Sequence, residues 1–351
     1  EYALARLERK TGEGYKGFSF TTEKSVTLEQ DLSRRDLTIN AIAKDAHGKF
    51  IDPYNGQRDI EQRLLRHVSP AFIEDPVRTL RVARFAARYH HLGFQVAPDT
   101  LELMRHMANV GEVDHLVPER VWKEFSSALN EKHPEVFITT LRDTGILKII
   151  LPELSKLFGI PQPEKHHPEI DTGLHALYSL SKACTLSKST AVRFASLLHD
   201  VGKALTPTED LPKHHGHEQK GESLIAELCV RLKVPNDIRD LCVLVTKFHT
   251  HCHRALELKP ATIMRTFESL EAFRRPERFN DFLLCCQADA QGRTGFTDKP
   301  YPQADIFRIA LEAANRVQAK DLVEQGYKGK ELGDELRVRR IKAIRNGIET
   351  P

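Results

Sequence analysis

Cysteine is scarce in this 351-residue sequence, and none of the six cysteines belongs to a CxxC pair. This scarcity argues against a disulfide framework or a zinc ribbon, and it favours the reducing environment of the cytoplasm. Long apolar runs are absent as well, because no stretch of about 18 apolar residues and no signal-peptide pattern occurs. We therefore expect a cytoplasmic protein with no membrane partner.

An excess of charge of one sign is also missing. The chain carries 52 Lys and Arg residues against 49 Asp and Glu residues, a formal net charge of +3. This balance does not by itself indicate a nucleic-acid partner, so any basic surface must be local. No internal repeat or low-complexity tract is present, and the length suits two or three domains.

Short β-like runs within residues 1–30 surround a Gly- and Lys-rich loop, and helical patterns follow for most of the chain. Thr27 is predicted to cap one helix, and Pro118 to stand in the first turn of another. "DPYNG" at 52–56 predicts a turn, and the Pro-rich segment 157–170 predicts a linker. The pattern indicates an α+β protein that is mostly α.

The stretch "EDPVRTLRVARFAARY" at residues 74–89 places four arginines on one predicted helix. Helical geometry keeps them within a sector of about 120°. They are Arg78, Arg81, Arg84 and Arg88. Buried arginines need partners, and the neighbouring sequence supplies few carboxylates on that face. Phosphates or base edges are therefore the expected partners.

Asp75 and Arg78 have two interpretations. In the structural one, Asp75 caps the helix and pairs with Arg78 one turn later. In the functional one, the two side chains read a base, because a carboxylate only accepts hydrogen bonds and a guanidinium only donates them. Cytosine and adenine present an amino donor beside a ring acceptor, whereas uracil and guanine present the reverse. Such a pair accepts C and A and rejects U and G.

A second charged stretch, "SRRDLTINAIA", lies upstream at residues 33–43. Arg35 is suited to neutralise a triphosphate, and Asp36 to accept a hydrogen bond from a ribose hydroxyl. Asn40 lies four residues after Asp36 and joins this candidate site. An exposed, charged helix start is the alternative interpretation.

Histidines are concentrated in one part of the chain, since ten of the seventeen lie between His166 and His253. "LLHDVGK" gives an adjacent His-Asp on an apolar helix, with another helical histidine upstream. This pattern is typical of a divalent metal bound by imidazole and carboxylate, whereas a lone histidine is usually structural. The predicted metal ligands are His175, His199 and Asp200, with His217, His249 and Asp289 as further candidates, and His199 and Asp200 are also the predicted catalytic pair.

Taken in order, the motifs resemble those of the bacterial (class II) CCA-adding tRNA nucleotidyltransferases with an HD phosphohydrolase domain. The resemblance covers essentially the whole chain and rests on "RRDLTINA", "DPYNG", "EDPVRTLRVARFAARY", "ERVWKE", "HHPEIDTGLH", "LLHDVGK", "HHGHE" and "ADAQGRTGF". It implies the remnant of a polymerase-β-like nucleotidyltransferase head followed by helical parts. The implied parts are a head remnant (1–66), a helical neck with the template helix (67–156), a linker (157–171), an HD domain (172–273) and a helical tail (274–351).

The resemblance also implies roles for individual residues. The helix after the EDxxR motif would be the amino-acid template for CTP and ATP, with Asp75 and Arg78 reading the base. "DPYNG" would be the hinge for switching from C to A, and "GEGYKGFSF" at 12–20 the flexible loop of the A-addition step. The implied nucleotide-binding residues are Arg35, Asp36, Asn40, Asp75, Arg78, Arg81 and Arg84.

Phosphoryl transfer with Mg²⁺ needs carboxylates that hold the ion against the triphosphate. The family supplies them from a GG…RD turn and a DxD motif, neither of which occurs in this sequence. Glu1 matches the strand position of a third carboxylate in related polymerases. We expect the chain to be an N-terminally truncated fragment that by itself does not extend tRNA.

The histidine-rich part resembles the HD phosphohydrolase superfamily, in which a metal activates water against a phosphate ester. Its metal would be Ni²⁺ or another divalent transition metal. The resemblance implies tRNA repair, in which this domain clears a damaged 3′ end before CCA is rebuilt. Thr250 stands where enteric-type members are expected to carry Asp, and we expect a lower rate with the metal retained.

The segment "ELRVRRIKAIR" near the C-terminus is suited to contact the tRNA backbone, and a solvated terminal helix is the alternative. Its predicted RNA-binding residues are Arg337, Arg339, Arg340 and Lys342. Three other functions remain open at this point: a poly(A) polymerase, a stand-alone HD phosphohydrolase and a non-catalytic RNA-binding protein. The expected assembly is a monomer or a homodimer.

Overall fold

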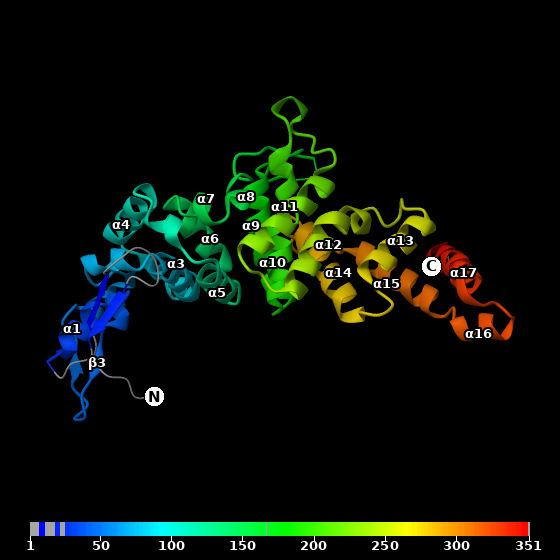
Figure 1. Ribbon diagram of the computed structural model, residues 1–351. Helices are drawn as coiled ribbons and strands as arrows, with labels where there is room; N and C mark the ends of the chain where they lie inside the picture. Colours follow the sequence, from blue (N-terminus) through cyan, green and yellow to red (C-terminus); the bar gives the residue numbers. More distant parts are fainter. Residues whose placement is uncertain (1–6, 11–17, 22–24, 166, 350–351) are drawn as a thin grey trace. The chain divides into compact units, whose positions relative to one another are not determined.

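The computed structural model describes residues 7–10, 18–21, 25–165 and 167–349 (Figure 1). Glu1 and most of the predicted flexible loop lie outside the described residues. The chain divides into two compact units. The first comprises Glu1–Lys156 with Val230–Val234, and the second comprises Leu157–Cys229 with Pro235–Pro351.

The first unit contains short helices and three two-stranded sheets (Figure 1). Strands β1 and β2 pair antiparallel, as do β3 and β4, whereas β5 and β6 pair parallel. Its elements are β1 (Leu7–Lys10), β2 (Phe18–Thr21), α1 (Leu28–Ser33), η1 (Thr38–Asn40), β3 (Ala43–Lys44), β4 (Phe50–Ile51), α2 (Gly56–Gln62), β5 (Leu64–Leu65), η2 (Pro70–Glu74), α3 (Val77–Tyr89), η3 (His90–Leu92), β6 (Gln95–Val96), α4 (Pro98–Asn109), η4 (Glu112–His115), α5 (Pro118–Leu129), α6 (Pro134–Asp143), α7 (Leu147–Ile150) and α8 (Pro152–Ser155).

Local sequence signals set several of these boundaries. Thr27 forms a capping box at α1, accepting a hydrogen bond from the Gln30 amide while the Gln30 side chain accepts one from the Thr27 amide. α5 begins at Pro118, as its first-turn proline predicts. In the predicted turn, Asp52 accepts hydrogen bonds from two backbone amides at the start of α2. The predicted caps and turn are confirmed.

Helix α3 packs against α5 and α6 within the first unit. Its apolar residues are buried, including Leu80 and Phe85. Phe85 lies within the arginine sector, and three guanidinium groups gather over its ring. That of Arg84 lies 4.8 Å from the ring centre. The arginine stems thus cover an aromatic side chain that sequence alone left unexplained.

Among its described residues, the second unit contains helices joined by loops and no strand (Figure 1). Helix α10 packs against α9, α12 and α14, and α17 packs against α13 and α15. Large aromatic side chains such as Phe194 and Phe282 are completely buried between these helices. The helices are α9 (Thr172–Leu186), α10 (Thr190–Leu198), η5 (Val201–Leu205), η6 (Thr208–Asp210), α11 (His217–Arg231), α12 (Asn236–His253), α13 (Pro260–Leu270), α14 (Pro276–Gln291), α15 (Pro302–Asn315), α16 (Ala319–Glu324) and α17 (Gly329–Glu349).

The segment predicted as a linker is packed against the second unit. Leu157 and Gln162 are buried, and the carbonyl of Ile160 accepts hydrogen bonds from both the amide and the hydroxyl of Thr172. Phe158 lies so close to Gly173 that a Cβ on that glycine would stand 2.5 Å from the ring. The segment therefore fixes the start of α9 instead of only connecting two domains.

The predicted fold class, mostly α with small sheets near the N-terminus, is confirmed. None of the described helices combines the length and the apolar character that a bilayer-spanning segment needs.

Candidate functional site

Asp75 lies in extended backbone between η2 and α3. Its Oδ1 atom accepts a hydrogen bond from the amide of Val77, the first residue of α3, at 3.2 Å, although Pro76 and not Asp75 is the N-cap residue of this helix. Its two oxygens also accept hydrogen bonds from the two terminal nitrogens of Arg120 on α5, at 3.0 and 2.8 Å. This bidentate pair adds a cation that sequence reasoning missed, although "ERVWKE" contained it.

Arg78 is buried, with 6% of its surface exposed. Its guanidinium donates to the carbonyl oxygens of Ala71 and Arg34, at 2.5 and 2.7 Å. These bonds tie η2 and the end of α1 to α3. They use two of the five N–H donors of the guanidinium.

The sequence near the arginine helix supplies few carboxylates, but more distant segments supply three. Three arginines of this helix form ion pairs with carboxylates from other segments, each with one N···O distance of 2.7 Å. The pairs are Arg81 with Asp36, Arg84 with Glu124, and Arg88 with Glu131. All three acids lie at least 40 residues from their arginines in sequence, so the helix sequence alone could not reveal them.

Asp36 joins the second charged stretch to α3. It is buried, and its Oδ1 accepts hydrogen bonds from the Leu37 amide and from the Asn40 side chain. Its Oδ2 accepts from Arg81. Arg35 points elsewhere, pairing with Asp31 at 3.3 Å, and its side chain is 46% exposed. The structure thus brings together Asp36, Asn40 and Arg81, while Arg35 keeps most of its donors toward solvent.

A cavity of about 490 Å³ lies beside α3 and α5. Three of its lining side chains are cationic and one is a carboxylate, so the cavity suits an anionic ligand. Its volume is within the range of roughly 300–1,000 Å³ typical of small-molecule sites. The lining residues are Val77, Arg81, Val117, Arg120, Lys123 and Glu124.

The histidine–aspartate centre is assembled from five helical segments. Each contributes from an end or a buried face, which directs the polar side chains inward between apolar neighbours. The contributions are His175 from α9, His199 and Asp200 from the end of α10, His217 from the start of α11, His249 from α12 and Asp289 from α14. All six predicted side chains therefore meet in one place.

Asp200 is surrounded by imidazole nitrogens. The Nε2 atoms of His199, His217 and His249 lie 3.2, 3.3 and 3.6 Å from its oxygens. Asp289 lies on the other side, 3.0 Å from Nε2 of His175 and 3.5 Å from Nε2 of His199. Two groups of three potential ligand atoms, each within 4.8 Å of one another, share His199.

The hydrogen bonds of these histidines fix which nitrogen carries the proton. Nδ1 of His199, His217 and His249 lies 2.8–3.0 Å from a backbone carbonyl, which can only accept. In the neutral imidazole, Nε2 is then an acceptor that faces the carboxylate of Asp200. Nε2 of His199, Nε2 of His217 and Oδ1 of Asp200 are buried without a hydrogen-bond partner. Acceptors converging on acceptors fit a divalent cation.

The pKa values of the centre show how strongly its two carboxylates favour positive charge beside them. Burial by itself lowers the pKa of His199, but the carboxylates of Asp200 and Asp289 outweigh it and raise this pKa to about 9. Burial likewise favours a neutral Asp200, yet the nearby cations of His199 and Lys203 hold its pKa well below the usual range. The two carboxylates thus stay charged and attract positive charge into the centre.

Three contributors were missed by sequence reasoning. Glu169 lies 3.0 Å from Nδ1 of His175, and a carboxylate behind a metal-binding histidine orients the ring. The Lys203 ammonium contacts Asp200 at 2.7 Å, and His253 contacts Asp289 at 2.6 Å. Glu169 and Lys203 belong to "HHPEIDTGLH" and "LLHDVGK", where a charged residue beside a candidate ligand is the only available signal.

A carboxylate from another helix contacts Thr250. Its hydroxyl donates to Oε1 of Glu218 on α11 at 3.0 Å. Glu218 directly follows His217, so an acidic group stands beside the centre although residue 250 itself is not acidic.

The basic segment of α17 is largely engaged within its own unit. Arg337 pairs with Glu268, Arg339 with Glu335, and the Arg340 guanidinium lies 4.2 Å from the centre of the Phe273 ring. Lys342 is exposed. These contacts favour the alternative of a structural helix, and RNA contact by this segment stays a prediction.

Gly202 allows η5 to approach α11 closely enough for His217 to reach Asp200. A Cβ at this position would stand 1.9 Å from the His217 carbonyl oxygen and 2.6 Å from the Gly221 amide nitrogen. We expect Gly202→Ala to lower the free energy of unfolding by about 2 kcal/mol or more, because backbone must shift, and to weaken metal binding. Denaturant unfolding and metal titration measure both effects.

Gly333→Ala is the matched control, because the space around that glycine on α17 is open. In a helix interior this change is expected to be neutral or stabilising by up to about 1 kcal/mol. A Gly202→Ala chain as stable as wild type and with unchanged metal affinity would show that the close approach does not position His217.

Three families of known proteins match parts of this chain. Residues 1–66 match the family described as the poly A polymerase head domain, and residues 93–158 match the probable RNA and SrmB-binding site of polymerase A. Residues 172–277 match the HD domain family. A polymerase head and an HD domain in one chain define a nucleotidyltransferase with an HD domain, a class that uses divalent metal ions.

Relatives along the full chain narrow this class. The multifunctional CCA protein of Teredinibacter turnerae is 61% identical over 100% of this chain and 86% of its own length. That of Thioalkalivibrio sulfidiphilus is 57% identical over 98% of this chain and 84% of its own length. The chain belongs to the multifunctional CCA protein family. The predicted family is confirmed, and it is favoured over a poly(A) polymerase, a stand-alone HD phosphohydrolase and a non-catalytic RNA-binding protein.

Solved structures support the fold. A CCA-adding enzyme in complex with CTP has a TM-score of 0.61 at 18% identity, with 92% of this chain and 69% of that chain covered. The Thermotoga maritima CCA-adding enzyme complexed with tRNA has a TM-score of 0.59 at 17% identity, with 95% and 77% covered. At these identities the likeness concerns the fold alone.

Proposed function

We propose that this CCA-adding tRNA nucleotidyltransferase acts on the 3′ end of tRNA at two places. The arginine helix selects CTP and ATP for synthesis of the CCA end, and the HD centre hydrolyses a terminal phosphate or 2′,3′-cyclic phosphate that blocks this synthesis. The observation that carries the second half is the convergence of buried acceptor atoms around Asp200, where no hydrogen bond satisfies them. A divalent cation would satisfy these acceptor atoms together.

At the arginine helix, Asp75 and Arg78 are the proposed base readers, and Arg120 is their support. Arg120 lines the cationic cavity and contacts both oxygens of Asp75, so the Asp75 carboxylate adjoins the cavity through Arg120. There an ionised acceptor favours the amino groups of C and A over the carbonyls of U and G. Arg81 lines the cavity and contacts Asp36, so a triphosphate and a ribose at these two residues is the arrangement we propose.

The other residues implied to bind the nucleotide have different proposed roles. Arg35 is exposed enough to reach a triphosphate. Asn40 fixes the carboxylate of Asp36. Arg84 is paired with Glu124 and contacts the Phe85 ring, so its proposed role is to hold α3 and α5 in register beside the nucleotide. Mg²⁺ is the metal proposed for nucleotidyl transfer, because triphosphate oxygens favour a hard cation.

At the HD centre, the residues fit a divalent metal. The proposed ligands are His175, His199, Asp200 and Asp289, with His217 and His249 as further candidates. A bound metal supplies a water of lowered pKa and polarises the phosphate. In hydrolysis, a water oxygen joins phosphorus, the bond to a ribose oxygen breaks, and that oxygen takes a proton to become a hydroxyl.

The residues around the ligands prepare this site. Glu169 orients the ring of His175, and the three backbone carbonyls behind the other histidines hold their tautomers. Lys203 neutralises part of the Asp200 charge and is itself held by the Gln162 amide oxygen at 2.9 Å.

The six cysteines are free thiols, which supports the proposed cytoplasmic location.

The ligand set predicts the choice of metal. Imidazole ligands favour Ni²⁺, Co²⁺ or Mn²⁺ over Mg²⁺. We expect hydrolysis of 2′,3′-cyclic AMP by the chain to be lost on chelation and restored at least about tenfold better by one of these ions than by Mg²⁺. The measurement is product formation after metal stripping and addition of each ion. Equal activity in the stripped enzyme would contradict a metal-dependent site.

A further inference from the structure

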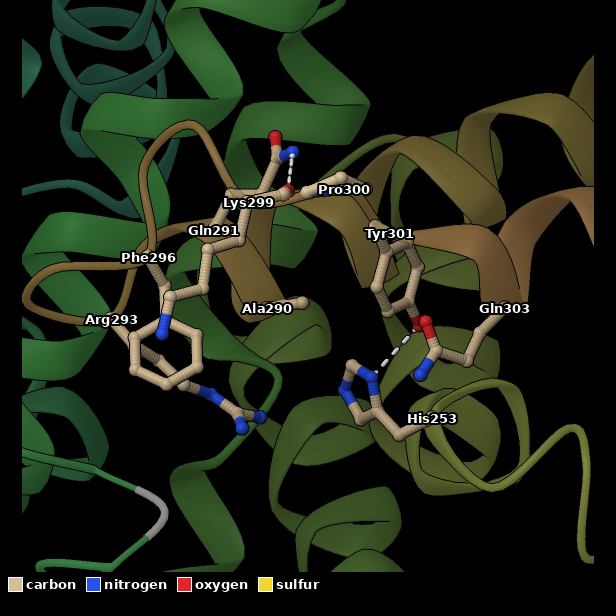
Figure 2. Close-up of a pocket in the computed structure, with 9 residues that line it drawn as sticks. All are labelled: His253, Ala290, Gln291, Arg293, Phe296, Lys299, Pro300, Tyr301 and Gln303. Atoms are coloured by element: carbon tan, nitrogen blue, oxygen red, sulfur yellow. Dashed lines mark hydrogen bonds between the residues drawn. The ribbon is translucent and has the colours of Figure 1, made fainter.

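A second cavity, of about 230 Å³, opens beside the HD centre. Figure 2 shows Arg293 and Phe296 on one side of it and Tyr301 with His253 on the other. The loop between α14 and α15 provides most of the wall. The lining residues are His253, Ala290, Gln291, Arg293, Phe296, Lys299, Pro300, Tyr301 and Gln303.

The cavity adjoins the centre through Asp289. The Nε2 atom of His253 lies 2.6 Å from one oxygen of Asp289, and a terminal nitrogen of Arg293 lies 3.4 Å from the other. Both side chains therefore touch a proposed metal ligand while also lining the cavity. A molecule in the cavity is one side chain away from the place where hydrolysis is proposed.

The chemistry of the lining suits an anion. Arg293 and Lys299 are cationic, and no carboxylate is among the lining residues. Nε of Arg293 and Oε1 of Gln303 are buried without a hydrogen-bond partner among the described residues. A buried guanidinium donor without an acceptor is costly, and a phosphate oxygen is the acceptor that best matches it.

The cavity wall is held in place before any ligand arrives. The Gln291 amide donates to the Lys299 carbonyl at 2.8 Å, which closes the loop (Figure 2). The Tyr301 hydroxyl lies 2.8 Å from Nδ1 of His253. The Lys299 ammonium lies 3.4 Å from the centre of the Phe296 ring. Aromatic rings next to cations are the elements with which proteins hold a nucleotide.

We propose that this cavity binds the 3′-terminal nucleotide of the RNA whose phosphate is hydrolysed at the HD centre. Arg293 contacts the phosphate, Gln303 accepts a hydrogen bond from a ribose or base donor, and Tyr301 and Phe296 flank the nucleoside. The volume is below the roughly 300–1,000 Å³ of clefts for larger ligands, so the cavity takes at most one nucleotide. The inference rests on the proposed phosphohydrolase function and names its binding residues.

Arg293→Met in the full chain tests the proposal, with Arg274→Met as the matched control because Arg274 is exposed outside the cavity. Kinetics use 2′,3′-cyclic AMP, binding of adenosine 2′-monophosphate is measured by calorimetry, and bound metal is counted per chain. We expect Arg293→Met to raise the KM and the Kd about tenfold or more, with metal content unchanged, because a charge-assisted contact is lost. Arg293→Lys is expected to recover part of the loss.

Lys299→Met provides a second variant, because this exposed side chain is not needed for folding. It is expected to raise the KM about threefold through weaker attraction of the anion. Unchanged KM and Kd in both variants, or loss of metal in Arg293→Met, would overturn the proposal, since the latter would make Arg293 only a support of Asp289. If the wild type binds adenosine 2′-monophosphate through Arg293 but hydrolyses nothing, the proposed phosphohydrolase function fails and the nucleotide-binding cavity stands. If hydrolysis is normal and Arg293→Met changes neither the KM nor the Kd, the phosphohydrolase function stands and the nucleotide-binding cavity is ruled out.

Discussion

His199→Ala and Asp200→Asn, made separately, are each expected to reduce metal-dependent hydrolysis of 2′,3′-cyclic AMP by at least about a thousandfold, because metal activation supplies several kcal/mol of transition-state stabilisation. His199 belongs to both groups of potential ligands, and Asp200 is the carboxylate on which three imidazoles converge. Asn is preferred to Ala at residue 200 because it keeps the shape of the side chain next to the buried Lys203.

The control for these variants is His215→Ala. His215 is an exposed histidine two residues before His217, so its loss changes the histidine count but not the centre. Initial rates, bound metal per chain and nucleotide binding by the first unit are measured for all three variants. Hydrolysis that persists in His199→Ala with full metal occupancy would show that the metal is held by other residues.

The histidine–aspartate centre shows how far sequence patterns reach. An adjacent His-Asp on an apolar helix identifies two ligands, and all six predicted side chains do converge. The residues that orient and neutralise them were missed, because Glu169 lies in a Pro-rich segment that resembles a linker. Its contact with His175 depends on how this segment packs against α9, which no periodicity encodes.

The arginine helix shows the opposite case. Its position, length and arginine sector follow from sequence, and α3 has the predicted extent within a few residues. The partners do not follow, because Asp36, Glu124 and Glu131 come from other segments and reach the helix only in the folded unit. A guanidinium that looks unpaired along one helix is therefore weak support for a phosphate ligand. The cationic cavity with Arg120 and Lys123 is the stronger observation.

The fold was predictable where short-range chemistry decides. The capping box at Thr27 and the proline that starts α5 are set by neighbours in sequence. Close approaches such as Gly202 against His217 are set by the packing of two segments, and the glycine alone does not announce them. Sites built on such approaches have to be read from the structure.

Base selection provides the last test, and it concerns Arg78. We expect Arg78→Ala to weaken binding of CTP and ATP about tenfold or more and to remove most of the preference over UTP and GTP, because the loss of one matched polar partner costs about 1–3 kcal/mol. Dissociation constants for the four nucleotides, measured by competition on the full chain, give the result without requiring turnover. Arg88→Ala is the matched control, since Arg88 lies on the same helix, pairs with Glu131 and is not a proposed nucleotide contact.

A structural role for Arg78 has a different signature, which makes the experiment decisive. Its guanidinium holds the carbonyls of Ala71 and Arg34, so alanine also lowers stability. If Arg78 only held the backbone, all four nucleotides would lose affinity by the same factor and their ranking would not change. Asp75→Asn separates the two roles further, because it keeps the shape of the side chain but replaces one acceptor by a donor. Under base reading, this variant shifts preference toward U and G, and an unchanged ranking in both variants would remove Asp75 and Arg78 from nucleotide selection.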